Sequence, residues 1–184
     1  MEYEIIRSRR RTLSVQVKNN RVTVRAPLRA SDAEIRRFLE AHRAWLEKHI
    51  LRARAAEQAK AGIRKLTKEE LADLKKRAKQ TIPERAAYWA PIIGVKYNRI
   101  AIRCQKTRWG SCSAQGNLNF NCLLMLTPPG VLDSIVVHEL CHLKHMNHSK
   151  RFYAEVTKAL PEYREHQKWL KEHGEALLAM AEEP

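Results

Sequence analysis

A short run at positions 138–142 carries side chains that can hold a metal ion, since it reads His-Glu-Leu-Cys-His. Residues four apart lie on one face of an α-helix, so a helix here lets His138 and His142 reach a single ion. Neutral imidazole suits Zn²⁺, and two such ligands leave room for a third ligand and a water. Glu139 lies about 100° further around the helix, where it can contact that water rather than the ion. The pattern predicts one Zn²⁺ per chain and hydrolysis with Glu139 as the catalytic base.

Three residues compete for the third ligand position. His148 lies ten residues after His138, beyond the expected end of the helix, and this interval matches that of metzincins. Glu155 offers a carboxylate from the next helix, as gluzincins use. His145 shares the helical face of the motif histidines, but it lies about 4.5 Å beyond His142 along the helix axis. We favour His148, and Glu155 and His145 stay open as alternatives.

The elements around the motif follow from apolar periodicity and turn residues. Apolar side chains on both sides of the motif predict a buried helix over residues 131–145, which begins after Pro128-Pro129-Gly130. A buried helix would not place two histidines and a glutamate inward without a partner, because unpaired polar groups there are costly. Ser149 can cap the next helix, and Pro161 suits the first turn of the last one.

The segments before the motif are expected to form a small sheet and a long helix. Residues 100–104 alternate as a strand, and residues 109–113 and 118–124 suit a hairpin with its turn at 115–117. Thr67 and Glu70 form a capping box that begins a helix, which Pro83 kinks or divides.

The N-terminal part shows a second hairpin and a further helix. Residues 12–26 alternate between apolar and polar side chains on both sides of Asn19-Asn20, which supplies the turn. Ser31 and Glu34 form a capping box for one helix that ends near Gly62. We therefore expect an α+β fold with an N-terminal part, residues 1–62, and a metallohydrolase core, residues 63–184, that together make one compact unit of 184 residues.

Charge is distributed unevenly along the chain. Residues 1–137 hold 28 Lys and Arg against 12 Asp and Glu, a net +16, whereas residues 138–184 hold 7 against 8, a net −1. Such a field favours polyanions, and Arg9, Arg10 and Arg11 form its densest cluster. We expect this basic surface to bind nucleic acid, with solubility alone as the alternative reading.

The four cysteines and the apolar content exclude several classes of protein. The gaps between Cys104, Cys112, Cys122 and Cys141 contain no C-x-x-C pair, so neither a zinc ribbon nor a disulfide scaffold is expected. The longest apolar stretch, residues 86–93, is about half of what a bilayer requires, so we expect no membrane partner. The chain starts without an apolar h-region, which predicts a cytoplasmic protein.

Three segments together resemble the YgjP-like (DUF45) metallopeptidase-type family. They are Lys106-Thr107-Arg108-Trp109-Gly110-Ser111-Cys112-Ser113, His138-Glu139-Leu140-Cys141-His142-Leu143, and Asn147-His148-Ser149 with Phe152. The resemblance implies a zincin-like core, zinc on His138, His142 and His148, and Glu139 as general base. It also implies a motif relationship to SprT-like proteases, which act on DNA-bound proteins.

Further residues and three classes of function stay open. Arg108 and Trp109 are expected to line the substrate cleft, and packing in the core is the alternative for Trp109. Tyr153 is a candidate hydrogen-bond donor to an oxyanion. A zinc metallopeptidase acting on peptides or proteins is favoured. The alternatives are a zinc-dependent nucleotide phosphohydrolase of the nucleoside triphosphate pyrophosphatase type and a nucleic-acid-associated protein with incidental hydrolysis. If the chain is a nucleotide phosphohydrolase, five arginines are expected to hold the phosphates: Arg7, Arg9, Arg10, Arg11 and Arg108.

Overall fold

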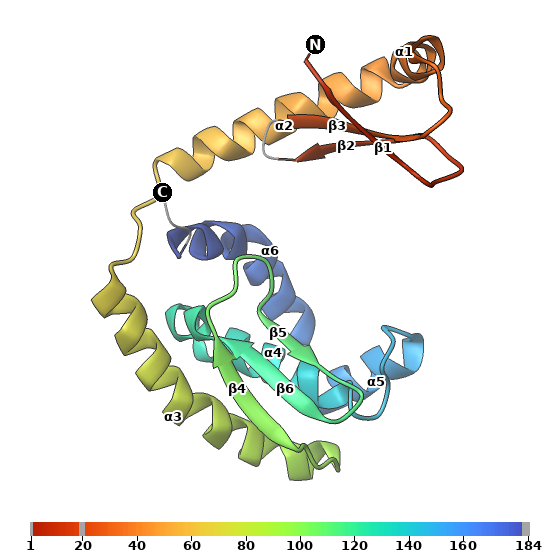
Figure 1. Cartoon of the computed structure of the whole chain (residues 1–184). Coiled ribbons are helices and arrows are strands. Elements are labelled where there is room, and N and C mark those ends of the chain that lie inside the picture. The colour runs from red at the N-terminus through yellow and green to blue at the C-terminus, as the bar shows by residue number, and fades with distance from the viewer. Residues whose placement is uncertain (1, 19–20, 182–184) are drawn as a thin grey trace. The chain divides into compact units, whose positions relative to one another are not determined.

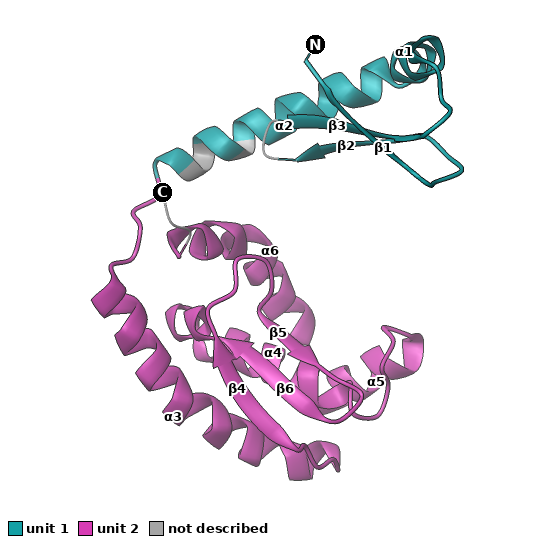
Figure 2. Ribbon diagram, viewed as in Figure 1, with its two compact units in different colours: residues 1–62 teal, residues 63–184 magenta. Residues whose placement is uncertain are grey.

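The computed structural model describes residues 2–18 and 21–181, and it divides into two compact units, residues 1–62 and 63–184 (Figure 2). The single compact unit expected from the sequence is therefore wrong. The physical reason is that the apolar side chains collect into two separate buried clusters, a small one around Val24, Ala26 and Ile35 and a large one within unit 2. None of the helices described is long and apolar enough to cross a membrane.

Unit 1 contains a three-stranded sheet of β1 (Glu4–Ser8), β2 (Ser14–Lys18) and β3 (Arg21–Pro27), in the order β1-β3-β2 (Figure 1). β2 and β3 pair antiparallel, which confirms the expected hairpin, while its turn at Asn19-Asn20 lies outside the described residues. β1, which the sequence does not predict, pairs parallel with β3. Each residue of β1 is exposed, so its sequence shows no alternation between buried and exposed positions.

Two helices, α1 (Asp32–Ala41) and α2 (Arg43–Ala61), replace the single helix expected between Ser31 and Gly62. The capping box of Ser31 and Glu34 is confirmed, since each side chain bonds the backbone of the other residue. The break falls at His42, which has φ −109° and ψ 14° and whose Nδ1 lies 2.8 Å from the Phe38 carbonyl. The His42 amide bonds the Leu39 carbonyl three residues back, so the regular α-helical bonding of α1 ends at this residue.

Unit 2 begins with α3 (Lys68–Ile93), which follows the confirmed capping box of Thr67 and Glu70. Pro83 lies inside this helix and neither ends nor divides it. Gly94 ends the helix in the left-handed region, φ 77°, which a glycine adopts without steric cost.

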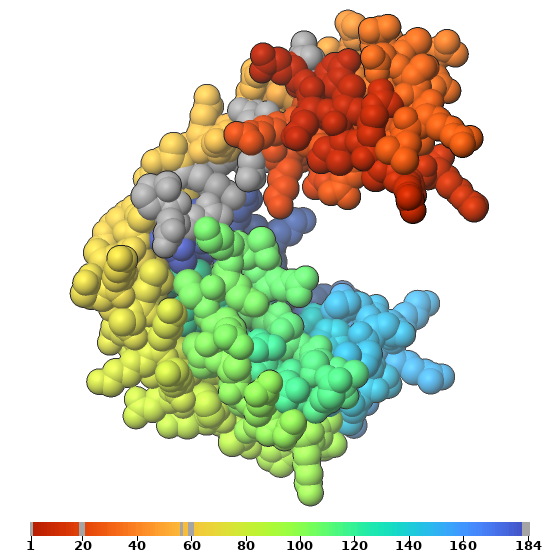
Figure 3. Space-filling view, in the orientation of Figure 1, coloured from red at the N-terminus to blue at the C-terminus, as the bar shows by residue number. Residues whose placement is uncertain are grey.

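The sheet of unit 2 consists of β4 (Arg99–Arg103), β5 (Gly110–Cys112) and β6 (Asn117–Asn121) in the order β4-β6-β5. β6 pairs parallel with β4 and antiparallel with β5, which confirms the expected strand and hairpin. The second arm of the hairpin is shorter than predicted, because residues 122–126 form the 3₁₀ helix η1 (Cys122–Leu126). Leu118 and Phe120 of β6 are buried, whereas the residues on the opposite face of this strand are polar. In the space-filling view, the residues coloured green form part of the visible surface of unit 2 (Figure 3).

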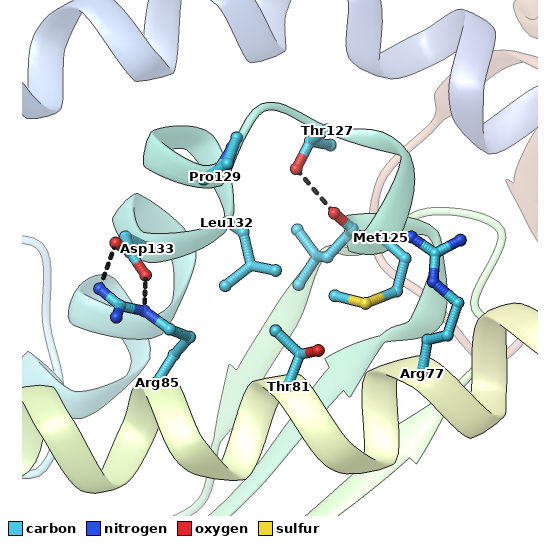
Figure 4. A pocket seen from close by; sticks show the side chains of 9 residues that line it. Arg77, Thr81, Arg85, Met125, Thr127, Pro129, Leu132 and Asp133 are labelled. Atoms are coloured by element: carbon cyan, nitrogen blue, oxygen red, sulfur yellow. Dashed lines mark hydrogen bonds and ion pairs between the residues drawn. The ribbon is translucent and has the colours of Figure 1, made fainter.

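The helix α4 (Pro129–Cys141) lies against both α3 and β5. Arg85 of α3 donates two hydrogen bonds of 2.6 Å to Asp133 of α4, which joins the two helices (Figure 4). The predicted end at residue 145 is wrong, because the chain after Cys141 turns more tightly, with amide N–H groups bonding carbonyls three residues back.

Two more helices complete the unit, α5 (Lys150–Ala159) and α6 (Tyr163–Met180), and both pack against α4. Ser149 caps α5 as predicted, since its hydroxyl accepts a hydrogen bond from the Phe152 amide. Pro161 lies outside α6 rather than in its first turn, because Glu162 is the N-cap residue.

Candidate metal centre

The end of α4 and the loop after it bring three imidazoles together. His138 lies in the last turn of α4, His142 is its C-cap residue, and His148 directly precedes the capping residue of α5. The Nε2 atom of His138 lies 3.2 Å from that of His142 and 3.1 Å from that of His148. Among the described residues, these three histidines have ligand atoms close enough together to hold one metal ion.

The geometry of the three nitrogens fits a zinc ion. Nitrogen ligands at about 2.0–2.1 Å from a tetrahedral Zn²⁺ lie about 3.3–3.4 Å apart, close to the distances in this cluster. The Nδ1 atom of His142 lies 3.0 Å from the His145 carbonyl, which can only accept, so this nitrogen carries the proton and Nε2 presents a lone pair. If His138 Nε2 carried a proton, that proton could be donated to the Nε2 atom of His142 or of His148, but not to both. A metal cation would instead accept the lone pairs of all three Nε2 atoms.

The surroundings favour the neutral form of His138 and His142, the form in which an imidazole binds a metal. Burial lowers the pKa of His138 to about 3, and the neighbouring His142 and His148 contribute in the same direction. Burial also lowers the pKa of His142. The fully buried Phe152 ring contributes to this environment, since its centroid lies 4.5 to 5.1 Å from those of all three imidazoles.

Two partners orient the ligand rings from behind. The His138 Nδ1 atom lies 2.8 Å from the hydroxyl of Tyr163 at the start of α6, and His142 is held by the His145 carbonyl. Such partners fix the tautomer and the ring orientation of a metal-binding histidine. Tyr163 was not predicted, because no local pattern relates a residue 25 positions away to the motif.

Glu139 lies against the edge strand β5 at Gly110. A Cβ atom built on Gly110 would lie 2.7 Å from both Cγ and Oε1 of Glu139, so the absence of a side chain permits this close approach. Glu139 is 6% exposed, and burial raises its pKa to about 8. The carboxyl group lines the same pocket as the three imidazoles.

A shallow pocket opens over the cluster, and Arg108 lies on its wall together with Gly110, Cys112 and the three histidines. Trp109 points elsewhere, because its indole packs against the large core and against Gly174 of α6. Of the two expectations for Trp109, packing in the core agrees with the structure. Tyr153 is 44% exposed, its ring centroid lies 6.2 Å from that of His148, and it is not among the residues that line this pocket.

The two alternative third ligands are placed away from the converging nitrogens. Glu155 accepts a hydrogen bond of 3.0 Å from Lys144, and this pairing lowers the pKa of the Glu155 carboxyl. His145 contributes its backbone carbonyl to His142, and its imidazole is not part of the ligand group. The geometry therefore favours His148 as the third ligand.

The arginine cluster belongs to unit 1, in the loop that joins β1 to β2. Arg7 forms an ion pair with Asp32 at 2.7 Å, whereas no carboxylate among the described residues pairs with Arg9, Arg10 or Arg11. All four cysteines are free thiols, as expected.

Comparison with known proteins identifies the family. The family described as "YgjP-like, metallopeptidase domain" matches residues 11–73 and 63–173, and the chain therefore belongs to the YgjP-like metallopeptidase-domain family. This membership confirms the resemblance seen in the motif segments, and it implies a bound metal.

Two solved structures of metallopeptidase zymogens are similar to part of the chain. One is abylysin of Pyrococcus abyssi, with 23% identity and a TM-score of 0.46 over 50% of this chain and 94% of that one. The other is jannalysin of Methanocaldococcus jannaschii, with 21% identity and a TM-score of 0.45 over 50% and 96%. No curated protein matches the chain.

Proposed function

We propose that the chain is a zinc-dependent metallopeptidase with a zincin-like active site, in which His138, His142 and His148 hold one Zn²⁺ and Glu139 is the general base. The observation that carries this proposal is that the Nε2 atom of His138 lies 3.1–3.2 Å from those of His142 and His148, in a pocket that a buried carboxyl group also lines. A site that only stabilised the fold would have no use for that carboxyl group.

The residues of the chain divide the work of peptide hydrolysis among them. A bound zinc ion would polarise the scissile carbonyl and lower the pKa of water. Glu139 takes the proton from the attacking water and returns it to the leaving amine. Tyr163 holds the His138 ring in place through the 2.8 Å contact with Nδ1.

The strand β5 offers backbone groups to an extended substrate. It is the edge of its sheet, and the residues that flank it bond towards β6: the Asn121 amide donates to the Trp109 carbonyl, and the Ser113 amide donates to the Asn117 carbonyl. Because backbone groups alternate in direction along a strand, those of Gly110 and Cys112 face the open edge. A peptide that pairs with this edge would lie beside Glu139. Arg108, on the pocket wall, is placed to bind a carbonyl or carboxylate of that peptide.

The test of the function compares substrates of different classes. Casein, nucleoside triphosphates and DNA are incubated with zinc-loaded protein, with chelator-treated protein and with Glu139→Gln. We expect chelator-sensitive cleavage of casein that Glu139→Gln loses by roughly 10²–10⁴-fold while it retains zinc. Hydrolysis of nucleoside triphosphates without cleavage of casein would instead establish the phosphohydrolase alternative.

The ligand assignment is tested by metal analysis of single variants. His148→Ala should lose most of its zinc, because it removes one of the three converging nitrogens, whereas Glu155→Ala should keep about one Zn²⁺ per chain. The opposite pair of results would place the carboxylate on the metal and refute the assignment of His148.

A further inference from the structure

A groove of about 690 Å³ runs between α5 and α6, outside the pocket over the cluster. Its walls include Lys150, Tyr153 and Ala154 from α5 and Tyr163, Arg164 and Gln167 from α6. These residues come from the facing sides of two consecutive helices, so the groove is built by the turn at residues 160–162 that reverses the chain.

The groove adjoins the candidate metal centre through two tyrosines, although none of its lining residues also lines the pocket over the cluster. Tyr163 lines it and also contacts the His138 Nδ1 atom at 2.8 Å. Tyr153, on the opposite wall, has its ring centroid 6.2 Å from that of His148. Each tyrosine therefore borders both the groove and an imidazole of the cluster, which places the groove one side chain away from the candidate metal centre.

Three donor side chains of the groove, those of Lys150, Arg164 and Gln167, are available to a ligand. Among the described residues, no carboxylate forms an ion pair with Lys150 or Arg164. The Nε2 atom of Gln167 is buried and has no hydrogen-bond partner, and an unpaired buried donor is costly. Two exposed cations without a carboxylate partner and a buried amide donor together suit an anionic group that accepts several hydrogen bonds.

The remaining walls suit the aliphatic part of such a ligand. The rings of Tyr153 and Tyr163 have centroids 6.5 Å apart, and Ala154 adds a small apolar surface. We propose that this groove binds an acidic side chain of a peptide substrate, glutamate above all, within one or two residues of the scissile bond. The inference rests on the proposed peptidase function and adds a substrate preference to it.

The first experiment reads the preference from cleavage sites. A proteome-derived peptide library is digested with zinc-loaded wild type, Arg164→Gln and Lys150→Gln, and with Lys171→Gln as a control on α6 outside the groove. We expect Glu and Asp to be enriched at one position near the cleaved bond by wild type and by Lys171→Gln. Each groove variant should lower kcat/KM for acidic peptides roughly tenfold, the loss of one charge-assisted hydrogen bond, and leave neutral peptides unchanged.

A charge reversal sharpens this test. Arg164→Glu should move the preference at the same position towards Lys and Arg, which a merely structural role of Arg164 does not predict. Cleavage without any acidic preference, or a preference that Arg164→Glu leaves unchanged, would overturn the groove assignment while the peptidase function stands.

The second experiment does not depend on turnover. N-acetyl-glutamate amide and N-acetyl-glutamine amide are titrated into zinc-loaded Glu139→Gln protein and followed by NMR. We expect the glutamate compound to bind roughly tenfold more tightly, and Arg164→Gln to remove that difference, which direct contact with zinc would leave intact. This result without any peptide cleavage would support the groove and refute the peptidase function. Inorganic triphosphate binding more tightly in the groove than the glutamate compound would overturn the assignment of a peptide carboxylate.

Discussion

The contact between Gly110 and Glu139 predicts the effect of adding a single methyl group. A Cβ atom at Gly110 would lie 2.7 Å from Cγ, 2.7 Å from Oε1 and 2.9 Å from Cδ of Glu139, closer than carbon atoms tolerate. Because Cγ lies near the backbone of α4, turning the end of the side chain does not relieve all three contacts. Gly110→Ala must separate β5 from α4 or displace the carboxyl group, and overpacking of this kind costs about 1–3 kcal/mol.

Urea unfolding of the zinc-free protein measures this cost, and the Glu139→Ala background isolates its cause. In that background Cγ, Cδ and Oε1 are absent, so Gly110→Ala should cost less than about 0.5 kcal/mol. Gly62→Ala serves as a matched control, because nothing lies within 4 Å of its added Cβ atom, and it should change stability by less than about 0.5 kcal/mol.

Zinc content should be unchanged in Gly110→Ala, since the substitution touches no proposed ligand. Turnover should fall about a hundredfold, the effect expected when a catalytic group moves by about 1 Å. An equal cost of Gly110→Ala with and without the Glu139 side chain would refute the reasoning, because the strain would then arise elsewhere.

Three further predictions concern charge, ligand orientation and polyanions. Burial raises the pKa of Glu139 from 4.5 to about 8, so ionisation of this carboxyl group destabilises the zinc-free fold progressively between these two pH values. Zinc-free Glu139→Gln should therefore equal wild type in unfolding free energy at pH 4.5 and exceed it by up to about 5 kcal/mol at pH 8, and parallel pH profiles would contradict this. Tyr163→Phe should weaken zinc binding about 10–100-fold in a competition titration with a chelating dye, because the His138 ring loses its partner. Neutralising Arg9, Arg10 and Arg11 together should weaken salt-dependent binding of labelled DNA, while Glu139→Gln should not; no binding of wild type at low salt and micromolar protein would refute a role for this cluster.

Local patterns were sufficient for the elements whose residues lie close together in sequence. Both capping boxes, at Ser31 and Thr67, occur where the sequence predicts them, because the bonds of a capping box join residues three positions apart. Prediction failed where a local rule had a competitor. The expected continuous helix breaks at His42, and Pro83 remains inside α3, because that helix packs its apolar face against the core of unit 2.

The spacing of the motif indicated which residues could meet, and the tertiary structure decided how. His138 and His142 share a helical face at a spacing that the sequence alone fixes, and Glu139 follows from the same periodicity. The interval of ten residues already favoured His148 over Glu155, and the tight turn after Cys141 shows how its imidazole reaches the other two.

The sequence by itself indicated the candidate ligands, a candidate general base, the family and most of the helices and strands. Only the tertiary structure placed Tyr163 behind His138, set Gly110 against Glu139 and turned Trp109 towards α6. The physical reason is the range of the interactions involved. Helical periodicity and capping act over a few residues, whereas these contacts depend on how α4, α6 and β5 pack, and many sequences with the same local pattern would pack them differently.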